Sequence, residues 1–389
     1  MSVPLKRFVS IDIFRAVIMF LMIFVNEIST VKNIPLWLHH AKANEDSMGL
    51  ADFIFPAFIF ITGLSIPLAI NARIKRNDSD YEICSYIVMR SVALIIIGFY
   101  QVNLEEYATL AFPKAAWALI ITTSFFFIWL NYSKTFNKII KYTLITTGIL
   151  LLISMALVYK SHNLSSIISM QPLWWGIIGI IGWSYLTCAI IYYIFKKSFN
   201  TLLIIFILFA SINIAFHTGV LNNKLWLIGD ASYVTLCIGG ILYTMQYIKK
   251  ENKLKLKKTW LVLACCAVLF ILIGFFLRPY AGGISKINST SAWVFICLGL
   301  SVILFTFFIY TNDKLQKNNL YKIICPAGTS SLTCYMMPYF LVYTMELFHI
   351  KYPEFLNEGI GGILRGLGIS FILIWIVGQM DRKNLTLKI

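Results

Sequence analysis

The chain has 389 residues, of which 59% are hydrophobic and only 13% are charged. Soluble domains typically carry about 25% charged residues. The composition therefore excludes an ordinary soluble enzyme, a disordered chain and a nucleic-acid-binding module, although the formal net charge is +16.

Long apolar runs account for most of the chain. A bilayer crossing needs about 20 apolar residues, so ten to twelve crossings use roughly 200 to 240 residues, close to the apolar share of this chain. The runs cover residues 11–29, 49–70, 86–104, 115–131, 139–159, 173–195, 201–218, 226–248, 259–277, 291–311, 325–345 and 359–380. They predict an all-α, polytopic integral membrane helical bundle of about 10–12 transmembrane helices. No linker or repeat divides the chain, so we expect a single transmembrane domain over residues 1–389.

The basic residues are distributed unevenly between the connections. If the amino terminus is cytoplasmic, the basic residues of the inner connections outnumber those of the outer ones by nearly three to one. Basic residues near membrane ends resist translocation, so this bias predicts that both termini are cytoplasmic. The basic run from Lys249 to Lys258 is then a solvated loop near anionic lipid, or a surface that steers an anionic ligand to the membrane.

Ionisable residues within the runs are concentrated near the amino terminus. A charged side chain at mid-helix costs about 2.5–3.5 kcal/mol on insertion scales, so each needs a partner, a cavity or an interface. Asp12 and Arg15 are three residues apart and can pair on one helix face. Asn26 and Glu27 lie at the other end of the same run.

The next polar positions surround the first outer connection. His39 and His40 lie within it, and no cysteine or carboxylate cluster completes a metal site there, so we expect no metal. Asp52 opens the second run, where it can cap the helix or bond a facing group. Arg90 begins the third run, where its side chain can reach the membrane edge.

These segments, taken together, resemble a known family. SIDIFRAVIMFLMIFVNE, LWLHHA and MGLADFIFPAFIFITGLSIPLAI, in this order, resemble the heparan-alpha-glucosaminide N-acetyltransferase family of membrane acyltransferases, including its compact bacterial members. GGISKINSTSAWVFICLGLSVILFTFF and PAGTSSLTCYMMPY are similar to its carboxy-terminal pattern. The resemblance implies a catalytic region within residues 1–104 and carboxy-terminal helices within 259–380. Where the family has an acidic-proline-glutamate-glycine stretch, this chain has IGDAS around Asp230.

The resemblance also implies a reaction. Cytosolic acetyl-CoA donates its acetyl group to an amino sugar, glucosamine or a terminal glucosaminide, on the outer side of the membrane. The family's active histidine precedes an alanine, which selects His40 as the general base. Asn26 matches a polar family residue and would donate a hydrogen bond to the developing oxyanion. We expect His39 and Glu27 to contact the substrate.

Further residues are assigned to support and to binding of acetyl-CoA. Asp12, Arg15 and Asp52 would hold the first two helices in register around the reacting centre. A guanidinium binds phosphate through paired hydrogen bonds, so the basic residues at the cytoplasmic side are candidate contacts for the phosphates of acetyl-CoA. These candidates are Arg15, Arg73, Arg76 and Arg90.

Alternatives remain at two levels. Direct transfer with His40 as base is preferred, and an acetyl-histidine intermediate is the other mechanism. A secondary transporter of a sugar or amino sugar also fits a bundle with buried charges, with Pro56, Pro326 and Pro338 as possible helix breaks. A scaffold without chemistry is a third reading.

The surroundings of the protein follow from the same patterns. The bias toward Ile, Lys and Asn indicates a bacterial inner (plasma) membrane. The expected partners are acetyl-CoA, an amino sugar acceptor and membrane lipid, without nucleic acid. The family resemblance also allows a homodimer.

Overall fold

The computed structural model describes residues 9–108, 112–133, 135–161, 169–223, 225, 228–251, 256–311 and 321–389. Over residues 247–251 and 256–261 it describes the backbone alone. Within these ranges the chain forms thirteen α-helices, short 3-10 helices and isolated β-bridges, without a β-strand.

The helices follow the apolar runs of the sequence. Their bounds are α1 Val9–Ile28, η1 Leu36–Leu38, α2 Leu50–Lys75, α3 Asp80–Val102, α4 Lys114–Trp129, α5 Lys138–Val158, α6 Gly176–Phe195, α7 Phe199–His217, α8 Ser232–Glu251, α9 Leu256–Leu277, α10 Ser291–Ile309, α11 Cys325–Thr329, α12 Ser331–Leu347, η4 Glu354–Leu356 and α13 Gly359–Arg382. Among the described residues, eight helices are long and apolar enough to cross a membrane, and two shorter apolar helices accompany them. The predicted all-α membrane bundle is confirmed.

One predicted run is divided. Residues 325–345 were expected as one span, but α11 ends at Thr329 and α12 begins at Ser331. Pro326 lies in the first turn of α11, where its missing N–H costs nothing. Pro56 and Pro338, by contrast, lie inside α2 and α12 without ending either helix.

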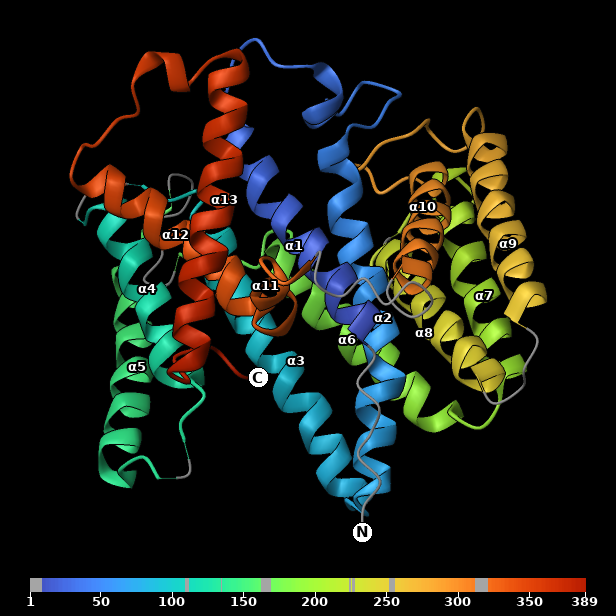
Figure 1. Ribbon diagram of the computed structural model, residues 1–389, viewed down its shortest axis with the longest axis horizontal. Coiled ribbons are helices and arrows are strands. Elements are labelled where there is room, and N and C mark those ends of the chain that lie inside the picture. Colours follow the sequence, from blue (N-terminus) through green and yellow to red (C-terminus); the bar gives the residue numbers. More distant parts are fainter. Residues whose placement is uncertain are drawn as a thin grey trace.

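Helix α1 lies at the centre of the bundle (Figure 1). It contacts α2, α10, α11, α12 and α13. On one side α4 packs against α5 and α12, and on the other α10 packs against α7, α8 and α9. Because α1 is enclosed by these neighbours, polar side chains on it can meet residues from distant parts of the chain.

Glycines allow the inner helices to approach closely. A Cβ on Gly63 of α2 would lie 1.9 Å from the carbonyl oxygen of Cys237 on α8. A Cβ on Gly98 of α3 would lie 2.2 Å from the amide nitrogen of Gly179 on α6. At these positions α2 meets α8, and α3 meets α6, backbone to backbone, as small residues allow between transmembrane helices.

Polar residues gather at the two ends of the bundle. The connection over residues 29–49 lies at the upper edge of Figure 1, and the α2–α3 junction lies at the lower edge. We call them the His40 end and the α2–α3 end. Helices α1 and α2 run between them, so each contributes residues to both.

Candidate functional site

His40 and Asp52 form a tight pair at the His40 end. The ring nitrogen Nδ1 of His40 lies 2.7 Å from Oδ1 of Asp52. A carboxylate can only accept hydrogen bonds, so we assign the hydrogen to Nδ1, which leaves the lone pair of Nε2 free. The side chain of Asp52 is 1% exposed, whereas that of His40 is 43% exposed. The pair therefore joins a buried orienting carboxylate to an imidazole that ligands can reach.

The second oxygen of Asp52 fixes the loop that carries His40. Oδ2 of Asp52 accepts hydrogen bonds from the backbone amides of Ala41 and Gly49, both at 2.9 Å. Asp52 thus caps the start of α2 and also bonds a facing group, the two roles that the sequence left open. A Cβ on Gly49 would lie 1.9 Å from the carbonyl oxygen of His39, so only glycine lets the two ends of this loop meet.

A second loop holds the first in place. Asp46 accepts hydrogen bonds from Nε of Arg278 at 2.8 Å and from the backbone amide of Ile284 at 2.6 Å. The bond from Ile284 lowers the pKa of Asp46 most, burial opposes it, and Arg278 lowers the pKa further. The loop over residues 278–290 is therefore pinned against the loop over residues 41–49.

This pinning brings Lys286 to the histidine. Nζ of Lys286 lies 3.2 Å from Nδ1 of His40, although 246 positions separate the two residues in sequence. Burial lowers the pKa of Lys286, and the nearby carboxylate of Asp52 opposes that effect. Nε1 of Trp293 on α10 also donates a hydrogen bond to the backbone carbonyl of Asp52 at 3.1 Å.

The pair opens into a cavity of about 780 Å³, which we call the His40 cavity. Its lining residues come from the end of α1, the η1 loop and the start of α2. They are Val25, Ser29, Leu36, Trp37, Leu38, His39, His40, Ala41, Lys42, Glu45, Ser47, Met48, Gly49 and Ala51. Trp37 is 63% exposed and offers an aromatic surface beside the histidines.

The other residues assigned to this end lie differently. His39 lines the His40 cavity and is half-buried. Asn26 is exposed and stands between Val25 and Ser29, which both line the cavity, but is not itself part of the lining. Glu27 is buried, and its backbone carbonyl accepts a hydrogen bond from Nη2 of Arg365 on α13 at 2.8 Å. Glu27 therefore faces α13 instead of the cavity.

A second cavity, of about 500 Å³, holds the predicted phosphate contacts. Arg15 of α1, Arg73 of α2 and Arg90 of α3 all line it, together with Tyr86 and Tyr185. We call it the arginine cavity. Arg76 is exposed at the end of α2 and does not line it. Three helices thus bring three guanidinium groups to one space.

Each guanidinium is held by specific contacts. Arg15 bonds Asp12 at 3.3 Å and the hydroxyl of Ser65 on α2 at 2.6 Å, so the expected pair with Asp12 is confirmed. Nη1 of Arg73 bonds Asp78 at 2.9 Å. Arg90 donates to the hydroxyl of Tyr86 at 3.2 Å, while its Nε is buried without a hydrogen-bond partner. Asp12 lies with the arginines, about 20 Å along α1 from Val25 of the His40 cavity.

The two cavities approach each other inside the bundle. On α1, Met22 lines the arginine cavity and Val25 lines the His40 cavity. These two residues are about 4.5 Å apart along the helix axis. On α2, Phe58 and Ala51 are the corresponding residues, about 10 Å apart. The cavities are separate in this structure.

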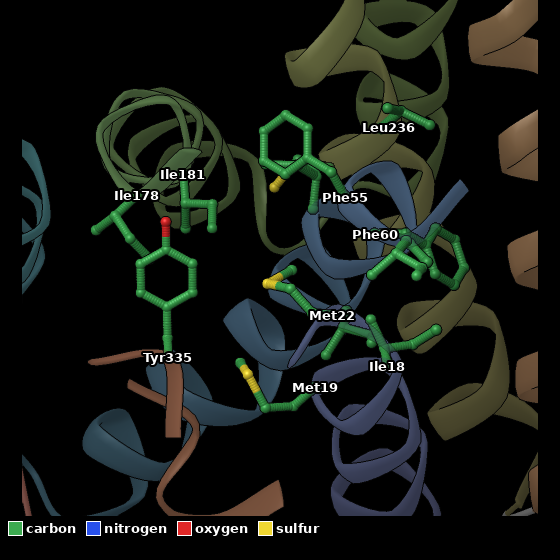
Figure 2. Packing of buried hydrophobic residues seen from close by; sticks show 14 of the residues in the cluster. Ile18, Met19, Met22, Phe55, Phe60, Ile178, Ile181, Leu236 and Tyr335 are labelled. Carbon is green, nitrogen blue, oxygen red and sulfur yellow. The ribbon is translucent and has the colours of Figure 1, made fainter. Parts of the chain in front are cut away.

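Apolar side chains lie along the inner part of the arginine cavity. Figure 2 shows Met19 and Met22 on α1, and Tyr335 on α12 directed toward Ile178 and Ile181 of α6. All five residues line the arginine cavity. Methionine is unbranched and adapts its shape readily, so this region can change its packing more easily than a wall of branched residues.

Comparison with known proteins gives these sites a context. No family model matches the chain. Over 97 residues, 25% of the chain, the sequence is 35% identical to the human (Homo sapiens) protein named heparan-alpha-glucosaminide N-acetyltransferase. Over 98 residues it is 34% identical to the mouse (Mus musculus) protein of the same name. Over about a quarter of its length the chain is similar to these two N-acetyltransferases.

The relationship covers part of each protein. The aligned region makes up 14% of the length of either relative. It confirms the family resemblance found in the sequence across a quarter of this chain. The relatives are named as N-acetyltransferases, which supports the interpretation of this chain as an acyltransferase.

The sequence alone assigns no role to Lys286 or Trp293. Both lie within the GGISKINSTSAWVFICLGLSVILFTFF segment that carries the resemblance. In the sequence, Lys286 is one of several basic residues in the outer connections. The one feature that could have pointed to Lys286 is its position in the segment that resembles the family. Its contact with His40 depends on the packing of two loops that are distant in the sequence.

Across the described ranges, no three side chains of His, Cys, Asp or Glu gather closely enough to hold a metal ion. The polar groups of the two cavities suit organic ligands. Guanidinium groups bind phosphate or carboxylate, and a histidine oriented by a carboxylate can accept a proton.

Proposed function

We propose that this protein is a transmembrane acetyltransferase that moves the acetyl group of acetyl-CoA to the amine of an amino sugar on the opposite side of the membrane. The observation that carries the proposal is the His40–Asp52 pair, with a contact of 2.7 Å and the cavity beside it. The relationship to N-acetyltransferases supports the reaction class.

The chemistry assigned to His40 follows from its hydrogen bond. The acceptor nitrogen attacks the thioester carbonyl carbon, a C–N bond forms and the C–S bond breaks. Nε2 of His40 takes a proton from the attacking amine and can then return it to the departing sulfur of CoA. Asp52 holds Nδ1–H and so keeps the ring in the tautomer that this step needs. An acetyl-histidine intermediate is the alternative route.

The arginine cavity is the proposed entrance for acetyl-CoA. The phosphates would contact Arg15, Arg73 and Arg90, and the cavity extends from Arg73 to Phe58, about 22 Å along α2. A further 9 Å or so separates Phe58 from Asp52 along the same helix. The pantetheine arm would thread through this region as the methionines and their neighbours move apart.

The membrane sidedness belongs to the same proposal. The α2–α3 end would face the cytoplasm, where the basic residues are concentrated, and the His40 end would face outward. We place the protein in a bacterial inner membrane on the composition of the chain. Asn26 at the outer end of α1 remains the proposed oxyanion donor, and His39 remains a proposed acceptor contact. Glu27 is buried against Arg365 of α13, so the proposal no longer includes it as an acceptor contact.

Reconstituted proteoliposomes test this function. Acetyl-CoA is supplied on one side and a panel of amino sugars on the other, and CoA release and sugar acetylation are measured. We expect CoA release that depends on the amino sugar, falling about 10²- to 10⁴-fold in His40→Ala. His349→Asn, which changes an exposed histidine in the α12–η4 connection, is the matched control and should retain activity.

The same experiment separates the transporter alternative. Uptake of unmodified amino sugar without CoA release would favour a carrier. Full activity of His40→Ala with normal folding would remove His40 from the mechanism. Retention of label from acetyl-CoA on a peptide containing His40, at the rate of turnover, would favour the acetyl-histidine route over direct transfer.

A further inference from the structure

Lys286 is the charged group beside His40 to which no role has been assigned so far. Its Nζ lies 3.2 Å from Nδ1 of His40, the nitrogen that also contacts Asp52. The approach is from the Nδ1 side, so Lys286 faces the oriented side of the ring and not the Nε2 lone pair that would accept a proton. This position suits a group that acts on the His40–Asp52 pair.

The loop that carries Lys286 is built to hold it there. The Asp46 contacts with Arg278 and Ile284 fix the first part of this loop. Beyond Lys286, Nδ2 of Asn288 donates a hydrogen bond to the backbone carbonyl of Ala43 at 3.4 Å. Contacts on both sides of Lys286 therefore tie its loop to the loop of His40.

The buried carboxylate of Asp52 has two neighbouring groups that can balance its charge. Asp52 is a 1% exposed carboxylate on α2, and a buried anion needs a neighbouring cation. Two groups can supply it, a protonated His40 or a protonated Lys286. The other titratable groups facing this point are the Cys297 thiol on α10, and His39, Lys42 and Glu45, which line the same cavity.

The two candidate cations have different consequences for catalysis. If His40 balances Asp52, the imidazole is protonated and cannot accept a proton from the acceptor amine. If Lys286 balances Asp52, the imidazole stays neutral, because a second positive charge beside the ammonium is disfavoured. Nδ1–H still bonds Asp52 in that state, so the Lys286 ammonium acts on the pair through its charge and not through a hydrogen bond to Nδ1. Nε2 stays free.

We propose that Lys286 is a positioning residue whose ammonium group balances the charge of Asp52 and thereby keeps His40 neutral and ready to act as a base. The proposal rests on the proposed acetyltransferase function. It assigns to the GGISKINSTS segment a part in the reaction, through contact with the first outer loop.

The pH profile of acetyl transfer tests the role of Lys286. Lys286→Met removes the charge and keeps much of the length, and Lys286→Arg keeps the charge. For Lys286→Met we expect the acid limb of kcat and of kcat/KM to move upward by about one pH unit or more. Activity then falls about tenfold near neutral pH and recovers at higher pH, while Lys286→Arg keeps the acid limb of the wild-type protein.

Controls separate charge from structure. All variants are assayed with the same acceptor, so that titration of its amine is common to them. Lys351→Met, which changes an exposed lysine in the α12–η4 connection, should leave the profile unchanged. Thermal unfolding of each purified variant shows whether it is folded.

The outcomes are distinct. An unmoved acid limb in folded Lys286→Met, or an equal loss at every pH, would overturn the role of Lys286. If Lys286→Met does not fold, the profile of Lys286→Arg decides, because a shifted acid limb there would overturn the proposal as well. If the wild-type protein releases no CoA with any acceptor, the proposed function itself fails, and the two failures are thereby distinguished.

Discussion

The two cavities are built on the same pair of helices in opposite ways. At the His40 end, both carboxylate oxygens of Asp52 are occupied, by His40 and by the amides of Ala41 and Gly49. In the arginine cavity, Nε of Arg90 is buried without a hydrogen-bond partner. The carboxylate of Asp52 has all its partners within the protein, whereas the arginine cavity retains a hydrogen-bond donor without a partner.

This difference matches different tasks. A proton-transfer group must be held in one orientation before the substrate arrives, which requires partners from the protein itself. A site for a charged ligand works better if some donors are completed by the ligand, because a buried donor without a partner costs about 1–3 kcal/mol. Helices α1 and α2 thus join a preorganised histidine–carboxylate pair to a cavity that holds an unpartnered guanidinium nitrogen.

The largest expected effect comes from the preorganised site. Asp52→Asn keeps the shape of the side chain but removes its charge, and the amide can then favour the wrong tautomer of His40. We expect kcat for acetyl transfer to fall about 10³- to 10⁴-fold, the scale seen when the carboxylate of a catalytic triad is replaced by an amide. Steady-state kinetics in detergent or proteoliposomes measure it.

The same variant tests whether Asp52 orients His40. Asp52 also caps α2, so circular dichroism and thermal unfolding must show that Asp52→Asn is folded. A folded variant with less than a tenfold loss would mean that the orientation of His40 does not depend on this carboxylate.

A smaller effect is expected in the arginine cavity. Arg90→Gln removes a guanidinium that can bond a phosphate, and hydrogen bonds to charged groups contribute about 1.5–3 kcal/mol. We therefore expect KM for acetyl-CoA to rise about 10- to 100-fold with little change in kcat, the pattern of lost uniform binding. Initial rates at varied acetyl-CoA concentration measure both constants.

Arg382→Gln is the matched control for this prediction. Arg382 is exposed at the end of α13 and does not line the arginine cavity. It should leave KM within about twofold of the wild-type value, as expected for an exposed charge outside a binding site. A drop in kcat for Arg90→Gln without a rise in KM would contradict the assignment of this cavity to acetyl-CoA.

The smallest effect is expected at the clamp between the two loops. Asp46→Asn weakens the ion pair with Arg278 and the hydrogen bond from the amide of Ile284. The side chains of Asp46 and Arg278 are both partly exposed to solvent. Exposed ion pairs contribute about 0.2–1 kcal/mol, so acetyl transfer should fall no more than about fivefold. Assays of kcat near neutral pH measure this effect.

The pH dependence of the clamp has a definite sign. The bond from Ile284 and the charge of Arg278 outweigh burial and hold the pKa of Asp46 below its usual value of 3.8. Its contribution to stability is therefore complete above that pH and is lost as the pH falls through the lowered pKa. Thermal unfolding of wild-type protein and Asp46→Asn should converge only in that acidic range, and convergence near neutral pH would contradict the clamp.

Local patterns in the sequence predicted much of the architecture. Each apolar run became helix because hydrophobic length alone decides whether a segment can span a bilayer with its backbone bonded internally. The pair of Asp12 and Arg15 was likewise predictable, since three positions along a helix bring two side chains to one face. The division of the run at 325–345 was not, because α11 and α12 separate where they pack around other helices.

The parts of the candidate sites were visible in the sequence, but their relations were not. His40 was selected by resemblance, while its contact with Asp52 depends on a loop that closes where Gly49 meets the carbonyl of His39. Arg73 and Arg76 looked equivalent as basic residues near one helix end. Only the packing of α2 against α3 and α6 turned Arg73 into the cavity and left Arg76 exposed.

The sequence by itself determined that this protein is a helical membrane bundle with its unusual charges near the amino terminus. Those features depend on local composition, which each segment carries wherever it lies. The tertiary structure alone decided that Lys286 meets His40 and that three helices contribute guanidinium groups to one cavity. Such tertiary contacts depend on which helices and loops pack together, and the packing depends on interactions throughout the chain.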